Sequence, residues 1–312
     1  MHKSTSESRD ASNKPLHLHF HLPRCAGQTI HRHLSRHAAR GTYFRAKKRR
    51  GPGRLFGARY QLDGMPQPET LLAVGGHWIG PSVERHFGGR PILRSILLRD
   101  PVSHFISYYN FRMMRYLSQG LRTYPVEIAY HARQRDFITH YLLRNFAEMS
   151  WPQLLSMSPQ EKRAAADRLL SSFWFVGDYR DCDELVAALA PNLDVPATNE
   201  RRNSSDQWQE RVGWRPLTQK DLTPSMVRQI RQENALDQSL WETWSDVAQA
   251  TPHLPALDTQ DMSLVRFATV QSLRLINQVR RRNHRGWRIP AETGPIADGT
   301  MCRPGVPLLR PS

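Results

Sequence analysis

The chain has 312 residues, and its 44 Lys and Arg outnumber its 28 Asp and Glu, which gives a formal net charge of +16. A hydrophobic fraction of 39%, without any run of about 18 apolar residues, excludes a membrane-spanning protein and predicts a soluble one. Three cysteines that lie far apart give neither a disulfide framework nor zinc-site spacing, so we expect a cytoplasmic protein without a metal. The excess of positive charge favours an anionic ligand or partner.

The hydrophobic pattern predicts alternating strands and helices behind a polar, disordered segment at residues 1–14. One α/β domain is expected over 15–255, with a mobile basic insertion at 41–70. A basic helix and an irregular tail are expected over 256–312, and the helix suits core packing, a subunit contact or peripheral contact with an anionic membrane. The expected strands are 16–22, 71–74, 92–98 and 173–177, and the expected helices are 29–34, 101–114, 125–146, 159–171, 184–190, 224–244 and 261–282.

Residues 16–29, LHLHFHLPRCAGQT, have the pattern of a phosphate-binding turn between a strand and a helix. Pro23 ends the strand, and the small residues Ala26 and Gly27 let backbone N–H groups face an anion near a helix start. Arg24 adds a full positive charge. An ordinary strand-to-helix turn has the same pattern, so this segment alone does not distinguish a phosphate-binding turn from an ordinary one. For Cys25, a small loop-filling residue is favoured over a nucleophile.

Residues 92–114 repeat the order of strand, sharp turn and helix. Asp100 can cap the helix and Pro101 suits its first turn, while Arg99 stands at the strand end and Ser107 follows eight residues later. An Arg and a hydroxyl that leave adjacent parallel strands can hold one phosphate together. The alternative is an Arg99–Asp100 pair with an unremarkable Ser107.

In this order the two segments resemble the two cofactor motifs of the sulfotransferase superfamily, especially its bacterial and carbohydrate branch related to heparan sulfate 2-O-sulfotransferase. The first motif matches residues 20–29 and the second matches 99–109, and weaker echoes stand at 175–189 and 234–244. The resemblance implies that Arg99 and Ser107 bind the 3′-phosphate of 3′-phosphoadenosine 5′-phosphosulfate (PAPS). It implies that the 5′-phosphosulfate end contacts Arg24, Cys25, Ala26, Gly27, Gln28 and Thr29.

The resemblance also implies a three-layer α/β fold like that of P-loop kinases, with a mainly parallel central sheet flanked by helices. The activity would be direct in-line sulfuryl transfer from PAPS to a hydroxyl of a carbohydrate or glycolipid, without a metal. The family carries a Gly-His dipeptide whose His is the proposed base, and here this is His77, which follows two glycines after a strand. Contacts to the adenosine end are expected from Arg201 and Ser204, beside 175–180.

Other assignments remain open at this stage. His77 could be an ordinary surface or core histidine, in which case Glu84 and Glu69 are the substitute bases. Arg24 replaces the family lysine and Gln28 replaces a usual hydroxyl residue, which puts the rate in question. Basic clusters at 45–54 and 280–288 suit a nucleic-acid-binding protein, although no RNA- or DNA-binding motif is present. A small-molecule kinase lacks the expected Lys-Ser/Thr pair. The acceptor and the oligomeric state are not indicated.

Overall fold

The computed structural model describes residues 14–48, 60–62, 64–119, 123–131, 134–198 and 215–245. Residues 1–13 of the expected disordered start at 1–14, the expected basic helix and tail (256–312), and Arg201 and Ser204 lie outside these residues. In the described part, no helix combines the length and apolar character needed to cross a membrane.

A six-stranded sheet forms the centre of the fold, in the order β3-β2-β4-β1-β5-β6. Five strands run parallel, and only β3 pairs antiparallel, with β2. Central β1 pairs with β4 on one side and β5 on the other, so that Leu18 stands opposite Val74 and Arg94. The strands are β1 (Leu16–Phe20), β2 (Tyr43–Lys48), β3 (Tyr60–Gln61), β4 (Ala73–Gly76), β5 (Ile92–Leu98) and β6 (Phe175–Asp178).

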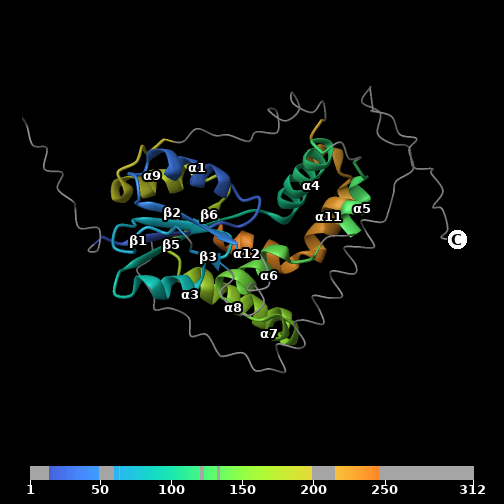
Figure 1. Cartoon of the computed structure of the whole chain (residues 1–312). Coiled ribbons are helices and arrows are strands. Elements are labelled where there is room, and N and C mark those ends of the chain that lie inside the picture. The colour runs from blue at the N-terminus through green and yellow to red at the C-terminus, as the bar shows by residue number, and fades with distance from the viewer. Residues whose placement is uncertain are drawn as a thin grey trace, which may run out of the picture. The chain divides into compact units, whose positions relative to one another are not determined.

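Helices cover both faces of this sheet, with α1 and α9 on one side and α3 and α8 on the other (Figure 1). This arrangement confirms the expected three-layer α/β fold with a mainly parallel sheet; the closer likeness to P-loop kinases stays a prediction. The helices are α1 (Gly27–His37), α3 (Pro81–Glu84), α4 (Pro101–Leu117), α5 (Val126–His131), α6 (Phe137–Tyr141), α7 (Trp151–Ser156), α8 (Pro159–Ser171), α9 (Cys182–Leu193), α11 (Pro224–Glu233) and α12 (Ala235–Trp244).

Strand β1 is buried on both faces, although its sequence alternates between apolar residues and histidines. On one face Phe20 packs edge-on against Phe146 and Phe173, with ring centroids 4.6 and 4.8 Å apart. On the other face His17 and His19 are also buried. A central parallel strand is covered by helices on both sides, so the polar positions of the alternation are enclosed as well. The sequence therefore puts neutral imidazoles inside the protein.

Three expected elements differ from the structure. The expected helix at 224–244 is divided at Asn234 into α11 and α12. Tyr43–Lys48, within the segment expected as a mobile insertion, form β2 and pair in parallel with β4. The expected helix at 125–146 is divided, because Asp136 takes a left-handed backbone conformation (φ 46°) before α6. After α6 the chain widens into a π-helical turn over Leu142–Phe146.

Candidate functional site

The predicted site residues follow three neighbouring strands, at the edge of the sheet where those strands end. The turn that contains Arg24 follows β1, His77 follows β4, and Arg99 follows β5. Because β1 lies between β4 and β5 and all three are parallel, these segments leave the sheet on the same side. In open α/β sheets, ligands bind outside the carboxyl ends of strands such as these.

The turn after β1 is formed by left-handed residues. Arg24 and Ala26 have φ values of 68° and 55°, and α1 begins directly afterwards at Gly27, two residues earlier than expected. The helix has no side-chain cap at its start, which suits an anion near its first-turn N–H groups. In the following turn Gln28 is exposed and Thr29 is half-buried.

Position 27 must be a glycine because the His21 side chain lies directly against it. A Cβ at this position would lie 1.8 Å from Cδ2 of His21. Gly75 and Gly76 are comparable: a Cβ would meet the ring of His31 at 2.7 Å and the carbonyl oxygen of Ala46 at 2.9 Å, respectively. The sequence also suggests that Gly75 and Gly76 let the backbone pass close to a ligand, but in the structure both glycines make room for neighbouring protein atoms.

Two arginines meet beside this turn. Arg24 Nε donates to Ser107 Oγ (3.1 Å), and Arg99 Nη1 donates to the carbonyl oxygen of Arg24 (2.9 Å). Burial, followed by the charge of Arg99, lowers the pKa of Arg24 to about 10, which leaves it charged at neutral pH. Among the described residues, no carboxylate forms an ion pair with either guanidinium. Two adjacent positive charges without a carboxylate partner suit an anion.

Arg99 and Ser107 are therefore brought together through Arg24, one at its carbonyl oxygen and the other at its side chain. The sequence did not indicate two further contacts of Arg99. Its Nε donates to Ser103 Oγ (3.1 Å), and its guanidinium lies 3.8 Å from the ring centroid of Tyr179. Ser103 lies in the first turn of α4, shortly after Arg99 in sequence, so the local sequence could have indicated this contact. Tyr179 follows β6 and comes into contact only through the fold.

Asp100 does what its position before a helix predicts. Its Oδ1 accepts from the backbone N–H groups of Val102 and Ser103, at 3.1 and 3.0 Å, and caps α4. Its other oxygen accepts from the Ser103 hydroxyl. The alternative of an Arg99–Asp100 pair is thus not the arrangement in the structure.

His77 is fixed by contacts on two sides. Its Nδ1 lies 2.6 Å from the carbonyl oxygen of His21, and its ring stacks on the His21 ring with centroids 3.9 Å apart. The Tyr141 hydroxyl donates to the His77 carbonyl oxygen (2.9 Å). Since a carbonyl can only accept, Nδ1 carries the proton, and Nε2 of the neutral ring keeps a lone pair. Burial lowers the pKa of His77 to about 4, so the ring is neutral and can accept a proton.

In the structure, the two alternative bases, Glu84 and Glu69, lie in surroundings other than those of His77. Both oxygens of Glu84 accept from Arg94, at 2.6 Å each, in a buried pair. Glu69 is exposed in the turn before β4, at the opposite end of that strand from His77. Burial raises the pKa of Cys25 to about 12, so its thiol is protonated, as expected for a loop-filling residue.

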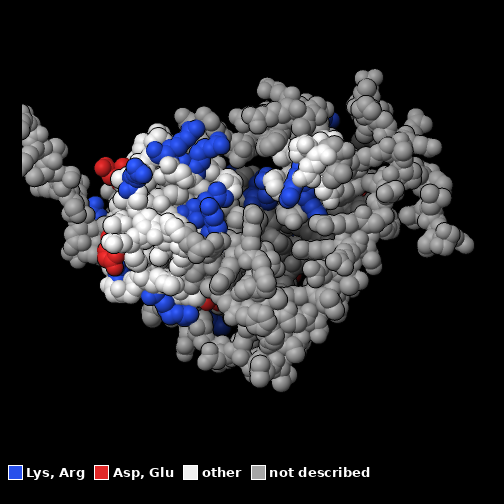
Figure 2. All heavy atoms as spheres, in the orientation of Figure 1, with Lys and Arg blue, Asp and Glu red and all other residues white. Residues whose placement is uncertain are grey.

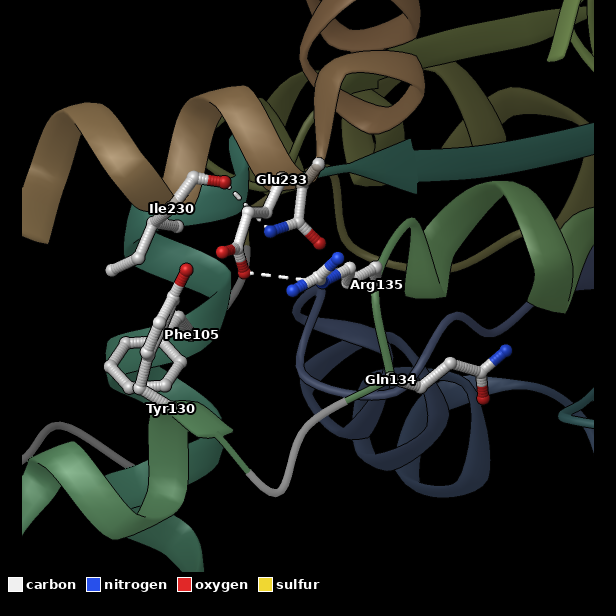
Figure 3. Close-up of a pocket in the computed structure, with 7 residues that line it drawn as sticks. Phe105, Tyr130, Gln134, Arg135, Ile230 and Glu233 are labelled. Carbon is white, nitrogen blue, oxygen red and sulfur yellow. Dashed lines mark hydrogen bonds and ion pairs between the residues drawn. The ribbon is translucent and has the colours of Figure 1, made fainter.

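Figure 3 shows a cavity that lies apart from the predicted site and is lined by other residues. It includes the Arg135–Glu233 ion pair (3.2 Å) and none of the residues predicted for the site. Its lining residues are Phe105, Tyr130, Gln134, Arg135, Ile230, Glu233 and Asn234. Within the described ranges, no group of His, Cys, Asp or Glu has the geometry to hold a metal ion.

The chain matches no known family model and no curated protein.

Proposed function

We propose that this protein is a sulfotransferase that moves a sulfuryl group from PAPS to a hydroxyl. The observation that carries the proposal is the meeting of Arg24, Arg99 and Ser107 beside an uncapped helix start, with neutral His77 after the neighbouring strand. A doubly phosphorylated donor needs concentrated positive charge. An alcohol acceptor needs a neutral base.

Each residue has a defined task in this proposal. Arg24 and the first-turn N–H groups of α1 stabilise the negative charge that grows on the leaving phosphate. Arg99, together with Ser107, holds the 3′-phosphate. His77 Nε2 takes the proton of the acceptor hydroxyl while the new S–O bond forms and the S–O bond to the leaving phosphate breaks. The turn and the histidine hold donor and acceptor in line.

The acceptor is proposed to be a carbohydrate or glycolipid hydroxyl, on the strength of the motif resemblance alone. On the face shown in Figure 2, the described residues present groups of Lys and Arg and only small groups of Asp and Glu. Such a surface speeds the capture of anions, with a strong dependence on salt.

Cys25 and Cys182 are buried free thiols, which suits the proposed cytoplasmic location.

The decisive experiment is calorimetric titration with 3′-phosphoadenosine 5′-phosphate (PAP), the product that PAPS leaves behind. The expected result is micromolar binding. A nucleic-acid-binding protein is the second candidate, and the basic surface favours it. Tight, salt-sensitive RNA binding without affinity for PAP would replace the proposal by this second function.

A further inference from the structure

His21 occupies a place between the two halves of the proposed reaction. Its imidazole lies against α1 at Gly27, where even a methyl group would overlap it. The same ring stacks on His77, with an angle of 24° between the planes. The turn at Gly27 belongs to the proposed donor site and His77 is the proposed base, so one ring contacts both.

The backbone of His21 adds a second contact to the same partner. Its carbonyl oxygen accepts the Nδ1–H of His77, although 56 residues separate the two in sequence. This hydrogen bond selects the tautomer, and the stacked ring limits the rotation of the His77 side chain about its bonds. Stacked ring pairs contribute beyond the area that they bury.

We propose that His21 is the positioning residue for His77: it orients the base and keeps it aligned with the donor turn. This inference rests on the proposed function for its catalytic consequence, but the orientation of His77 can be measured without turnover. Gly27, which has no side chain, leaves the space that the His21 ring occupies. A reactive geometry is sensitive to displacements of about 1 Å, so a fixed base favours turnover more than donor binding.

The test compares a planar with a non-planar replacement. His21→Phe keeps a flat ring against His77, and His21→Leu fills the space without one. The matched control is His17→Leu, because His17 lies on the same face of β1, is equally buried and contacts the Trp174 ring. Circular dichroism confirms the fold of each variant before it is compared.

The first readout is the tautomer of His77, from histidine ¹⁵N chemical shifts assigned by comparison with His77→Asn. Native protein, His21→Phe and His17→Leu are expected to show one Nδ1–H tautomer. His21→Leu is expected to show a mixture, because without the stacked ring the His77 side chain can rotate away from the His21 carbonyl oxygen. The second readout is turnover: His21→Leu should lower kcat roughly tenfold, while the Kd for PAP changes less than about threefold and His21→Phe keeps most of the kcat.

Two outcomes would overturn the inference. One is a His21→Leu variant that matches His17→Leu in both the His77 tautomer and kcat. The other is an equal loss in His21→Leu and His21→Phe, because the flat ring would then not be what matters. If the native protein neither binds PAP nor transfers sulfate, the proposed function fails by itself, and the tautomer still decides whether His21 positions His77.

Discussion

Arg99 links the proposed 3′-phosphate site to the donor turn, because the same guanidinium donates to the Arg24 carbonyl and faces Tyr179. Arg99→Ala should weaken PAP binding by about 2–4 kcal/mol through the loss of charge-assisted hydrogen bonds. Adenosine 5′-phosphosulfate lacks the 3′-phosphate, so its binding should fall much less, with the remaining loss arising from the turn. Calorimetry with both ligands measures the difference. Equal losses would place Arg99 outside the 3′-phosphate site, and Arg168→Ala, which removes an exposed Arg of α8, is the control.

His77 separates chemistry from binding. A base acts mainly in the transition state, so His77→Ala should lower kcat on the order of a hundredfold while the Kd for PAP stays nearly constant. The sequence alone predicts an acid limb of the rate near pH 6–7. Burial lowers the pKa of His77 to about 4, so the folded protein should keep a competent base down to that pH. A rate that falls near pH 6.5 while circular dichroism is unchanged would contradict this assignment.

Helices α6 and α12 cap each other. Asp237 in α12 accepts from the backbone N–H groups of Ile138 and Thr139 at the start of α6, at 2.9 and 2.7 Å. In return, Asp136 accepts from the N–H groups of Leu236 and Asp237 at the start of α12, at 3.0 and 3.3 Å. Both helix starts are thus satisfied by a partner about a hundred residues away in sequence. Because α6 also carries Tyr141, this exchange supports the backbone of His77.

Asp237→Ala should therefore be costly. It leaves two backbone N–H groups and the Thr139 hydroxyl without their acceptor in a buried position, which should lower the free energy of unfolding by about 3 kcal/mol. Thr223→Ala is the matched comparison, because Thr223 is an exposed cap of α11 whose loss should cost about 1 kcal/mol. Urea unfolding measures both variants. Equal losses would show that the exchanged caps do not hold α6 to α12.

The sequence predicts those elements whose determinants are local. The strands β1, β4 and β5 are near-continuous apolar runs or alternations, and the Asp-Pro start of α4 caps the helix as its residue types require. The break before α6 depends on Asp136, whose partners lie in α12 and are invisible to a local pattern. Strand β2 was missed because its basic residues resemble a solvated loop until β4 pairs with it.

For the candidate site, motif spacing indicates Arg24, Arg99 and Ser107, and the Gly-His dipeptide indicates His77. The fold brings the segments that carry these residues to one edge of the sheet, and their roles stay a prediction. The pairing of Arg24 with Ser107 was not expected, because it depends on how the turn bends at its left-handed residues. The stacking of His21 on His77 joins residues 56 positions apart, so only the packed structure could reveal it.

The molecule as a whole encloses several neutral histidines, and acid should unfold it. Burial lowers the pKa of His17 to about 4 and that of His19 to about 3, and it also lowers the pKa values of His21 and His31 well below the usual range. The unfolded chain binds protons near pH 6.5 and the folded one does not, so stability is complete above pH 6.5 and falls below it. Two such histidines remove about 3 kcal/mol per pH unit, against a typical total of about 5–15 kcal/mol.

His17→Leu tests this expectation. Both ring nitrogens of His17 are buried without a hydrogen-bond partner, so leucine removes a proton-binding group and breaks no hydrogen bond. The midpoint of acid unfolding, followed by circular dichroism, should move to lower pH. Asp237 opposes this loss of stability at low pH. Burial raises its pKa to about 6, so the folded protein gains stability when Asp237 is protonated. An unchanged midpoint in His17→Leu would show that the β1 histidines do not control acid unfolding.

The exchanged caps of α6 and α12 also set an order of events for a chain that grows on the ribosome. Ile138, whose N–H group needs Asp237, is synthesised 99 residues before it. At a rate of about 5–20 residues per second, the first turn of α6 waits roughly 5–20 s for its acceptor. Until then the helix that supports His77 has an open end, although the central strands β1, β4 and β5 already exist. The proposed base is therefore among the last parts of the protein to be secured, and a nascent chain would hold the donor turn before it holds a working acceptor side.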